Sequence, residues 1–130
     1  MRFAPRTGLD RPLRCGKSVE AGLEQGPLVD AQAVAKVEEH TADATALGAK
    51  VAAGGKRHAL GGTFFEPTIV THVKPDMMVA REETFGPVAP IFRFRDEQEA
   101  IRMANDTEFG LASYFYTRDL ARAWRVAEGL

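Results

Sequence analysis

The 130-residue sequence has only one cysteine, Cys15, which excludes an internal disulfide framework. Its three histidines, His40, His58 and His72, are isolated from one another and from Cys15, so the spacing of a metal site is missing. We expect these histidines at surface or partly buried positions. The sequence also has no Gly-x-Gly-x-x-Gly, no P-loop and no Gly-x-Ser-x-Gly motif. We therefore predict no metal ion and no serine nucleophile.

An excess of one charge and long apolar runs are absent too. The 17 basic and 18 acidic residues give a net charge of −1, so nothing draws the chain toward nucleic acid or an anionic membrane. No apolar run approaches the roughly 20 residues that a membrane span needs, and no secretory signal is visible. The apolar fraction of 45% is ordinary for a soluble globular protein. We predict a cytoplasmic protein, which the scarcity of cysteine fits.

Residues 1–21 differ in composition from the remainder. Most of this segment is rich in arginine, and Pro5 and Pro12 interrupt any helix. We predict a disordered or non-homologous segment here, with an organelle-targeting peptide as the alternative. A reactive thiolate needs an oriented base or a cationic partner held in place, so we predict that Cys15 in this segment is no nucleophile.

Helix signals recur from Gly26 onward. Apolar residues at spacings of three and four predict a helix that begins at Asp30 and runs to about Ala49. Similar signals predict helices that begin near Asp96 and Asp119. Asp76 is expected to cap one brief helical turn.

Strand signals alternate with these helices. β-branched and apolar runs predict strands over residues 50–53, 68–71, 88–94 and 111–116, with Pro90 marking a bulge or a sheet edge. This alternation predicts an α/β fold with a mostly parallel sheet and flanking helices. The expected core residues are Phe64, Ile69, Ile91, Phe92, Ile101, Phe115 and Trp124.

The most informative stretch is Glu82-Glu83-Thr84-Phe85-Gly86-Pro87-Val88. One interpretation is a polar loop, with Phe85 packed on the core and Gly86-Pro87 forming the turn. A second is a cofactor site, because a carboxylate on a strand-entry loop can accept hydrogen bonds from the vicinal hydroxyls of a ribose. A neighbouring aromatic ring can pack beside the same sugar. The residues alone leave both interpretations open.

This stretch resembles the Glu-Glu-x-Phe-Gly-Pro motif of the aldehyde dehydrogenase superfamily. The likeness runs from about Gly22 to Leu130, and residues 22–130 are interpreted as part of the family's catalytic domain. Within the superfamily, the chain is most similar to succinate-semialdehyde dehydrogenases over residues 33–40, 89–94 and 113–116. Further matches follow in the family's order at residues 25–30, 64–68, 104–112 and 117–120.

The resemblance implies a parent enzyme that oxidises succinate semialdehyde to succinate with NADP+ or NAD+. In such enzymes a cysteine attacks the aldehyde, hydride passes to the nicotinamide, and a glutamate activates the water that releases the acid. By position, Glu83 would bind the nicotinamide ribose hydroxyls, and Phe85 would pack against that ribose and the nicotinamide. Lys36 would supply a second ribose contact, although Ala33 replaces the glutamine that often accompanies it. The implied partners are a small aldehyde and further copies of the same subunit.

The chain differs from the family in the residues that carry out the reaction. The family's Gly-Gln-x-Cys nucleophile, water-activating glutamate and oxyanion-stabilising asparagine have no counterpart here, so we predict no catalytic residue in this sequence. We expect the chain to be a truncated part of an enzyme, inactive by itself. The alternatives are a non-catalytic module that binds a nucleotide or associates with intact subunits, and the remnant of a broken gene.

Overall fold

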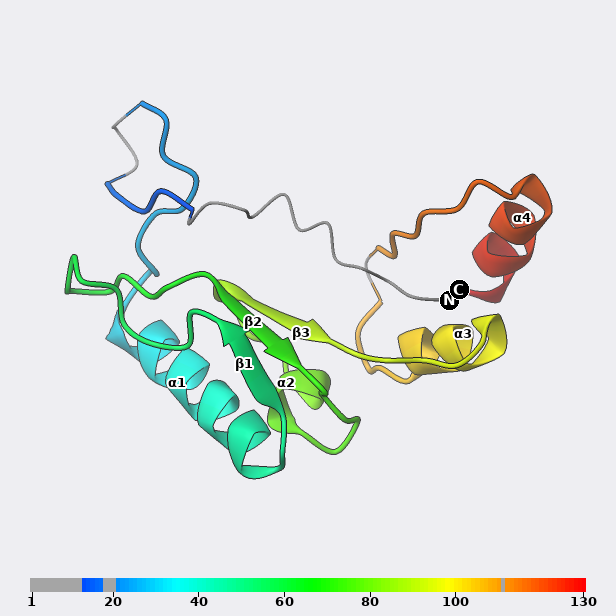
Figure 1. Ribbon diagram of the computed structural model, residues 1–130, viewed down its shortest axis with the longest axis horizontal. Coiled ribbons are helices and arrows are strands. Elements are labelled where there is room, and N and C mark those ends of the chain that lie inside the picture. Colours follow the sequence, from blue (N-terminus) through cyan, green and yellow to red (C-terminus); the bar gives the residue numbers. More distant parts are fainter. Residues whose placement is uncertain (1–12, 18–20, 111) are drawn as a thin grey trace. The chain divides into compact units, whose positions relative to one another are not determined.

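The computed structural model describes residues 13–17, 21–110 and 112–130 (Figure 1). The chain divides into two compact units, Met1–Phe92 and Arg93–Leu130, and each is described by itself. Most of the segment predicted to be disordered, residues 1–12 and 18–20, lies outside the described residues. In its described part, Cys15 forms a parallel β-bridge with Gln25.

Helix α1 spans Ala31–Ala46 and begins where the sequence predicts. The side chain of Asp30 caps it by accepting a hydrogen bond from the Ala33 amide at 2.7 Å. The helix ends shortly before Gly48, which adopts a left-handed φ of 96°. Spacings of three and four place one apolar face on the core. The buried residues of this face are Val34, Val37, His40, Thr41 and Ala44.

Strands β1 (Lys50–Ala53), β2 (Thr68–Thr71) and β3 (Val88–Ile91) form one sheet in the order β1-β2-β3. β1 and β2 are antiparallel, whereas β2 and β3 are parallel. The α/β prediction is confirmed, but the sheet is mixed rather than mostly parallel. Residues 54–67 fold back through an antiparallel bridge between Arg57 and Phe65, which returns the chain beside β1 as in a hairpin.

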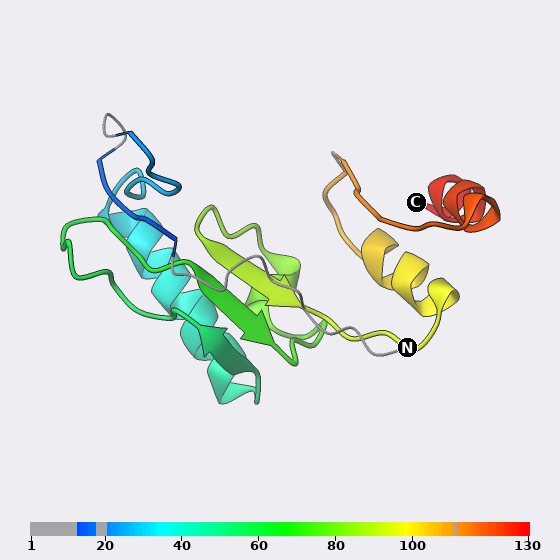
Figure 2. The same cartoon turned by 45° about the horizontal axis from the view of Figure 1, so that its top comes forward.

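Helix α2 spans Met78–Arg81 and contacts α1. Figure 2 gives a second view of the sheet with its helices. The Met78 amide donates to Asp43 Oδ2 of α1 at 2.8 Å, so Asp43 caps this helix instead of the predicted Asp76. One buried cluster joins both helices to β2, and it consists of Ala44, Ala49, Val70, Val73, Met77 and Val79. A second buried cluster contains Val34, Val37 and Phe65. Val88 of β3 packs against both clusters.

Among the predicted core residues of this unit, Phe92 packs against the first cluster, whereas Ile69 and Ile91 are not buried. Thr68 and Val70 are buried in β2, while Ile69 between them is only half-buried. Ile91 in β3 points away from the helices and is 47% exposed, although the sequence predicts it in the core. The prediction failed because a continuous apolar run contains no alternation from which the buried face could be read.

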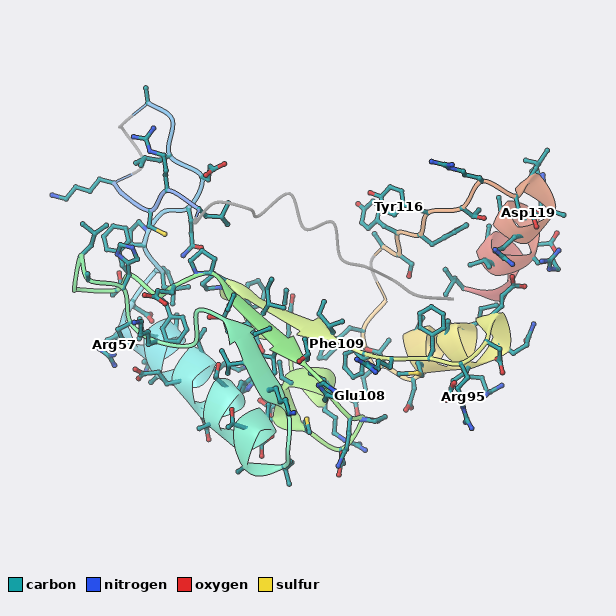
Figure 3. All side chains as sticks on the ribbon, in the orientation of Figure 1. Arg57, Arg95, Glu108, Phe109, Tyr116 and Asp119 are labelled. Atoms are coloured by element: carbon teal, nitrogen blue, oxygen red, sulfur yellow. The ribbon has the colours of Figure 1, made fainter. Side chains whose placement is uncertain are left out.

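The loop that connects β1 to β2 lies against α1. Arg57 on this loop donates to both carboxylate oxygens of Glu38 on α1, at 2.7 Å and 2.8 Å. Figure 3 shows Arg57 beside the helix. Hydrogen bonding from Arg57 lowers the pKa of the Glu38 carboxyl below its ordinary value. The ion pair is exposed, so it orients the loop more than it stabilises the fold.

The second unit consists of helices α3 (Glu97–Asn105) and α4 (Leu120–Gly129), capped by Asp96 and Asp119 as the sequence predicts. The Glu97 carboxylate accepts hydrogen bonds from Arg122 Nε at 2.9 Å and Arg125 Nε at 3.0 Å. At the other end of α3, the Asn105 amide donates to the Gly129 carbonyl at 2.7 Å. Polar bonds therefore join the two helices at both ends of α3.

The strand predicted over residues 111–116 is not formed in the part that is described, residues 112–116. Tyr116 on this irregular segment is 97% exposed (Figure 3). Phe115 and Trp124, both predicted in the core, are 39% and 65% exposed. A strand requires a neighbouring ladder of hydrogen bonds, and the described residues of this unit contain no strand to supply one.

Two glycines of the β1–β2 connection test the packing of the first unit. Gly54 and Gly61 have φ angles of 68° and 70°, so alanine at either position carries left-handed strain of about 1 kcal/mol. A Cβ on Gly54 would also overlap the Pro67 carbonyl oxygen, whereas the space around Gly61 is open. In urea unfolding, we expect Gly54→Ala to lose about 1–3 kcal/mol more stability than Gly61→Ala. Equal losses would contradict this packing.

The Glu97 cluster predicts acid sensitivity of the second unit. Hydrogen bonds from Arg125 and Arg122 hold the pKa of Glu97 below its usual 4.5. A depressed folded-state pKa means that the stabilisation is present above about pH 4.5 and is lost as the pH falls through the folded value. Circular dichroism should show less acid-induced helix loss in Glu97→Gln than in the unaltered chain. Glu39→Gln, an exposed change on α1, is the control, and identical curves for all three chains would refute the prediction.

Candidate functional site

The candidate site is the loop that joins α2 to β3, residues 82–87. Its first residue, Glu82, ends α2 in an extended conformation, with φ −109° and ψ 141°. Burial then alternates along the loop: Thr84 and Gly86 are half-buried, whereas Glu83 and Phe85 are exposed. Phe85 is 74% exposed, which rules out the interpretation that it packs on the core of its own unit. One edge of the loop faces the protein, and the other faces solvent.

The inner edge is held by polar groups of α1. His40 is completely buried, and its Nδ1 lies 2.5 Å from Thr84 Oγ1, within hydrogen-bonding distance. His40 Nε2 lies 3.5 Å from Glu82 Oε2, close enough for attraction but too far for a good hydrogen bond. Lys36 Nζ lies 3.7 Å from the same carboxylate oxygen. One turn of α1 therefore meets the loop at Glu82 and at Thr84.

Close packing fixes the remainder of the inner edge. Gly86 lies so near to α1 that a Cβ at this position would overlap Val37 Cγ2. Beyond it, the Pro87 carbonyl accepts a hydrogen bond from the Thr68 amide at 2.7 Å, which joins the end of the loop to β2. The loop is thus attached at its start, middle and end, and the outward direction of Glu83 and Phe85 follows from these attachments.

The predicted cofactor residues occupy two different positions. Glu83 and Phe85 lie on the exposed edge, where their side chains are accessible to a ligand. Lys36 does reach this loop, but its described ion-pair partner is Glu82. His40, Glu82 and Thr84 are also parts of the site, although no role was predicted for any of them from the sequence. His40 was expected at a surface or partly buried position, but its spacing of three from Val37 and four from Ala44 places it on the buried face.

Cys15 lies in an environment that disfavours a reactive thiolate. Partial burial raises the pKa of its thiol, and the nearby carboxylates of Glu66 and Glu24 raise it further. Over the residues that the structure describes, no three His, Cys, Asp or Glu side chains gather as metal ligands would. Nor does any helix in those ranges combine the length and hydropathy of a membrane span.

The chemistry that the loop offers is binding and orientation. A carboxylate accepts hydrogen bonds from neighbouring hydroxyls, an exposed aromatic ring packs on a sugar or a flat ring, and a nearby ammonium group donates. These groups suit a ligand that carries neighbouring hydroxyls and a flat ring. None of these groups is a thiol or a hydroxyl nucleophile.

Comparison with known proteins identifies the class. The model of the aldehyde dehydrogenase family matches residues 9–130, so the chain belongs to the aldehyde dehydrogenase family. Within it, the chain is similar to the semialdehyde dehydrogenases. It is 67% identical over 118 residues to glutarate-semialdehyde dehydrogenase of Pseudomonas aeruginosa. It is 58% identical over 118 residues to the succinate-semialdehyde dehydrogenase (NADP(+)) of Escherichia coli. Each alignment covers 91% of this chain and 24% of the relative, so the chain spans about a quarter of their length.

Solved structures agree with this assignment. The succinate-semialdehyde dehydrogenase from Burkholderia pseudomallei superposes with a TM-score of 0.88 at 63% identity, over 91% of this chain and 24% of that one. Betaine aldehyde dehydrogenase from Staphylococcus aureus, solved in complex with NAD+, gives a TM-score of 0.85 at 39% identity, with the same coverage. The matched family range begins at residue 9, earlier than the resemblance that the motifs carry from Gly22.

The contact between Gly86 and Val37 predicts a compensating pair of substitutions. Gly86→Ala should destabilise the chain by about 1–3 kcal/mol, because the added methyl overlaps Val37. Val37→Ala alone also destabilises by opening a cavity. Combined, the two should lose less stability than the sum of the single losses, by about 1 kcal/mol or more. Additive losses in a denaturant double-mutant cycle would show that α1 does not constrain the loop.

Proposed function

We propose that this chain supplies the loop that binds the nicotinamide ribose in an NAD(P)+-dependent aldehyde dehydrogenase. The observation that carries the proposal is the outward display of Glu83 and Phe85 on a loop that α1 holds from behind. The similarity to enzymes named for NADP(+) and to a structure solved with NAD+ supports it. When bound, this cofactor supplies the acceptor for the hydride that leaves the substrate.

Each side chain has a distinct part in this proposal. The Glu83 carboxylate accepts hydrogen bonds from the two ribose hydroxyls, and its exposure leaves both oxygens free to do so. The Phe85 ring packs against the ribose and the nicotinamide and keeps water from that side. The side chain of Lys36 is 43% exposed, and it donates to the ribose when it turns away from Glu82.

We infer that the whole enzyme oxidises a short semialdehyde that carries a terminal carboxylate, in the cytoplasm and as a homo-oligomer. Succinate semialdehyde is the first candidate. Glutarate semialdehyde is the second, because the relative of that name is 67% identical. One methylene separates the two, and enzymes distinguish such a difference by only about 1–3 kcal/mol. The ratio of kcat/KM for the two aldehydes, measured on an enzyme that carries this chain, decides between them.

By itself, the 130-residue chain is expected to show no aldehyde oxidation, because none of its residues matches the family's cysteine nucleophile. Incubation with succinate semialdehyde and NADP+ should give no growth of the reduced-cofactor absorbance. Turnover by the isolated chain would overturn this division between binding and chemistry.

A hybrid enzyme tests the binding proposal. The 118 aligned residues of this chain replace their counterparts in the Escherichia coli succinate-semialdehyde dehydrogenase. In this hybrid, Glu83→Gln should raise KM for NADP+ about tenfold, since hydrogen bonds to a charged group are lost. Phe85→Ala should lower kcat by releasing the nicotinamide. Neither substitution should change KM for the aldehyde severalfold.

Glu39→Gln is the matched control, because Glu39 is an exposed acid on α1 outside the described contacts with the loop. It should leave all kinetic constants within about twofold. An inactive hybrid that folds, or an unchanged KM for NADP+ in Glu83→Gln, would contradict the proposed function.

A further inference from the structure

We propose that His40 and Thr84 form a latch between α1 and the loop, and that this latch positions Glu83 and Phe85 for the cofactor. The inference rests on the proposed function of those two residues. It assigns roles to side chains that touch neither cofactor nor substrate: His40 and Thr84 are positioning residues, and Glu82 is their electrostatic neighbour.

The first support for the latch is the complete burial of His40. His40 is 0% exposed, so its ring nitrogens have no access to solvent and depend on protein groups. Among the described residues, Thr84 lies within hydrogen-bonding distance of Nδ1, whereas Nε2 has no hydrogen-bond partner and faces the Glu82 carboxylate at 3.5 Å. A polar ring buried on the same helix face as Val34, Val37 and Ala44 is unfavourable unless polar groups face it, and the loop residues Thr84 and Glu82 do so.

The neighbouring charge selects the tautomer. A carboxylate can only accept, so Nε2, which faces Glu82, carries the hydrogen in the neutral ring. Nδ1 is then an acceptor, and the Thr84 hydroxyl donates to it across 2.5 Å. Nε2 has no hydrogen-bond partner among the described residues, so Glu82 acts on the ring by its charge alone, and the bond between Nδ1 and Thr84 attaches the loop to α1. Lys36 balances the charge of Glu82 from the preceding turn of α1.

The latch separates the two adjacent glutamates by role. Glu82 faces α1 and takes part in holding the loop, whereas Glu83 faces outward. Since Thr84 lies between Glu83 and Phe85 in the chain, release of its hydroxyl would let both outward side chains shift together. Cofactor binding would then weaken while the aldehyde site stays unchanged, a pattern that general loss of folding does not produce.

The hybrid enzyme described above provides the test. Thr84→Val keeps the shape of the side chain and removes the donor, and it should raise KM for NADP+ about fivefold with KM for the aldehyde unchanged. Thr84→Ser restores the hydroxyl and should restore KM. Thr71→Val makes the same chemical change on β2 and is the control. In the described residues, the Thr71 hydroxyl bonds the Lys50 carbonyl and the ring of its neighbour His72, and neither belongs to the loop. This control should leave KM for NADP+ unchanged.

A second pair of variants changes the other partner. His40→Asn retains a polar atom near the Nδ1 position and should recover much of the latch, whereas His40→Gln places its amide nearer the Nε2 position and should match Thr84→Val. Adding Thr84→Val to His40→Gln should then change KM little further, because the interaction is already lost.

The outcomes separate the latch from the function that it serves. If Thr84→Val leaves KM for NADP+ within twofold while Glu83→Gln raises it, the latch is wrong and the proposed function stands. If both KM values rise equally in Thr84→Val, the residue is merely structural and the latch is equally refuted. If Glu83→Gln has no effect, the proposed function itself fails.

Discussion

The contact between one face of α1 and the loop at residues 82–87 is the constraint on which the site depends. His40 Nδ1 lies 2.5 Å from Thr84 Oγ1, within hydrogen-bonding distance, and Val37 leaves room only for glycine at position 86. The same helix face belongs to the buried core, so the loop is positioned by residues that also hold the unit together. Loss of this face would therefore affect the fold and the site together.

From this constraint follows a division between inward and outward residues. Burial alternates along residues 83–86, so neighbouring side chains of the loop face opposite sides. Fixing Thr84 and Gly86 inward leaves Glu83 and Phe85 exposed, without any further contact being required to orient them. A carboxylate and an aromatic ring presented in this way suit a ribose and a flat ring, while the chain has no residue that matches the family's nucleophile. The chain thus combines the proposed binding edge with a support that α1 supplies.

Much of the fold could be predicted from sequence, because local signals decided it. Asp30, Asp96 and Asp119 cap their helices as expected, since a carboxylate directly before a helical apolar pattern accepts a hydrogen bond from a free amide of the first turn. Burial and strand direction depend on distant residues, so Ile91 and Trp124 were wrongly predicted in the core, and the antiparallel β1–β2 pair was not predicted. Glu83, Phe85 and Lys36 came from a motif, whereas His40 and Thr84 lie 44 positions apart and only the folded chain brings them together.

The most direct test of the account is a crystal structure of the hybrid enzyme with NADP+ bound. In that structure we expect the Glu83 carboxylate to accept hydrogen bonds from the nicotinamide ribose hydroxyls, Phe85 to lie against the same half of the cofactor, and Thr84 to remain bonded to His40. A ribose bound by Glu82, or one that touches no residue of the loop, would contradict it.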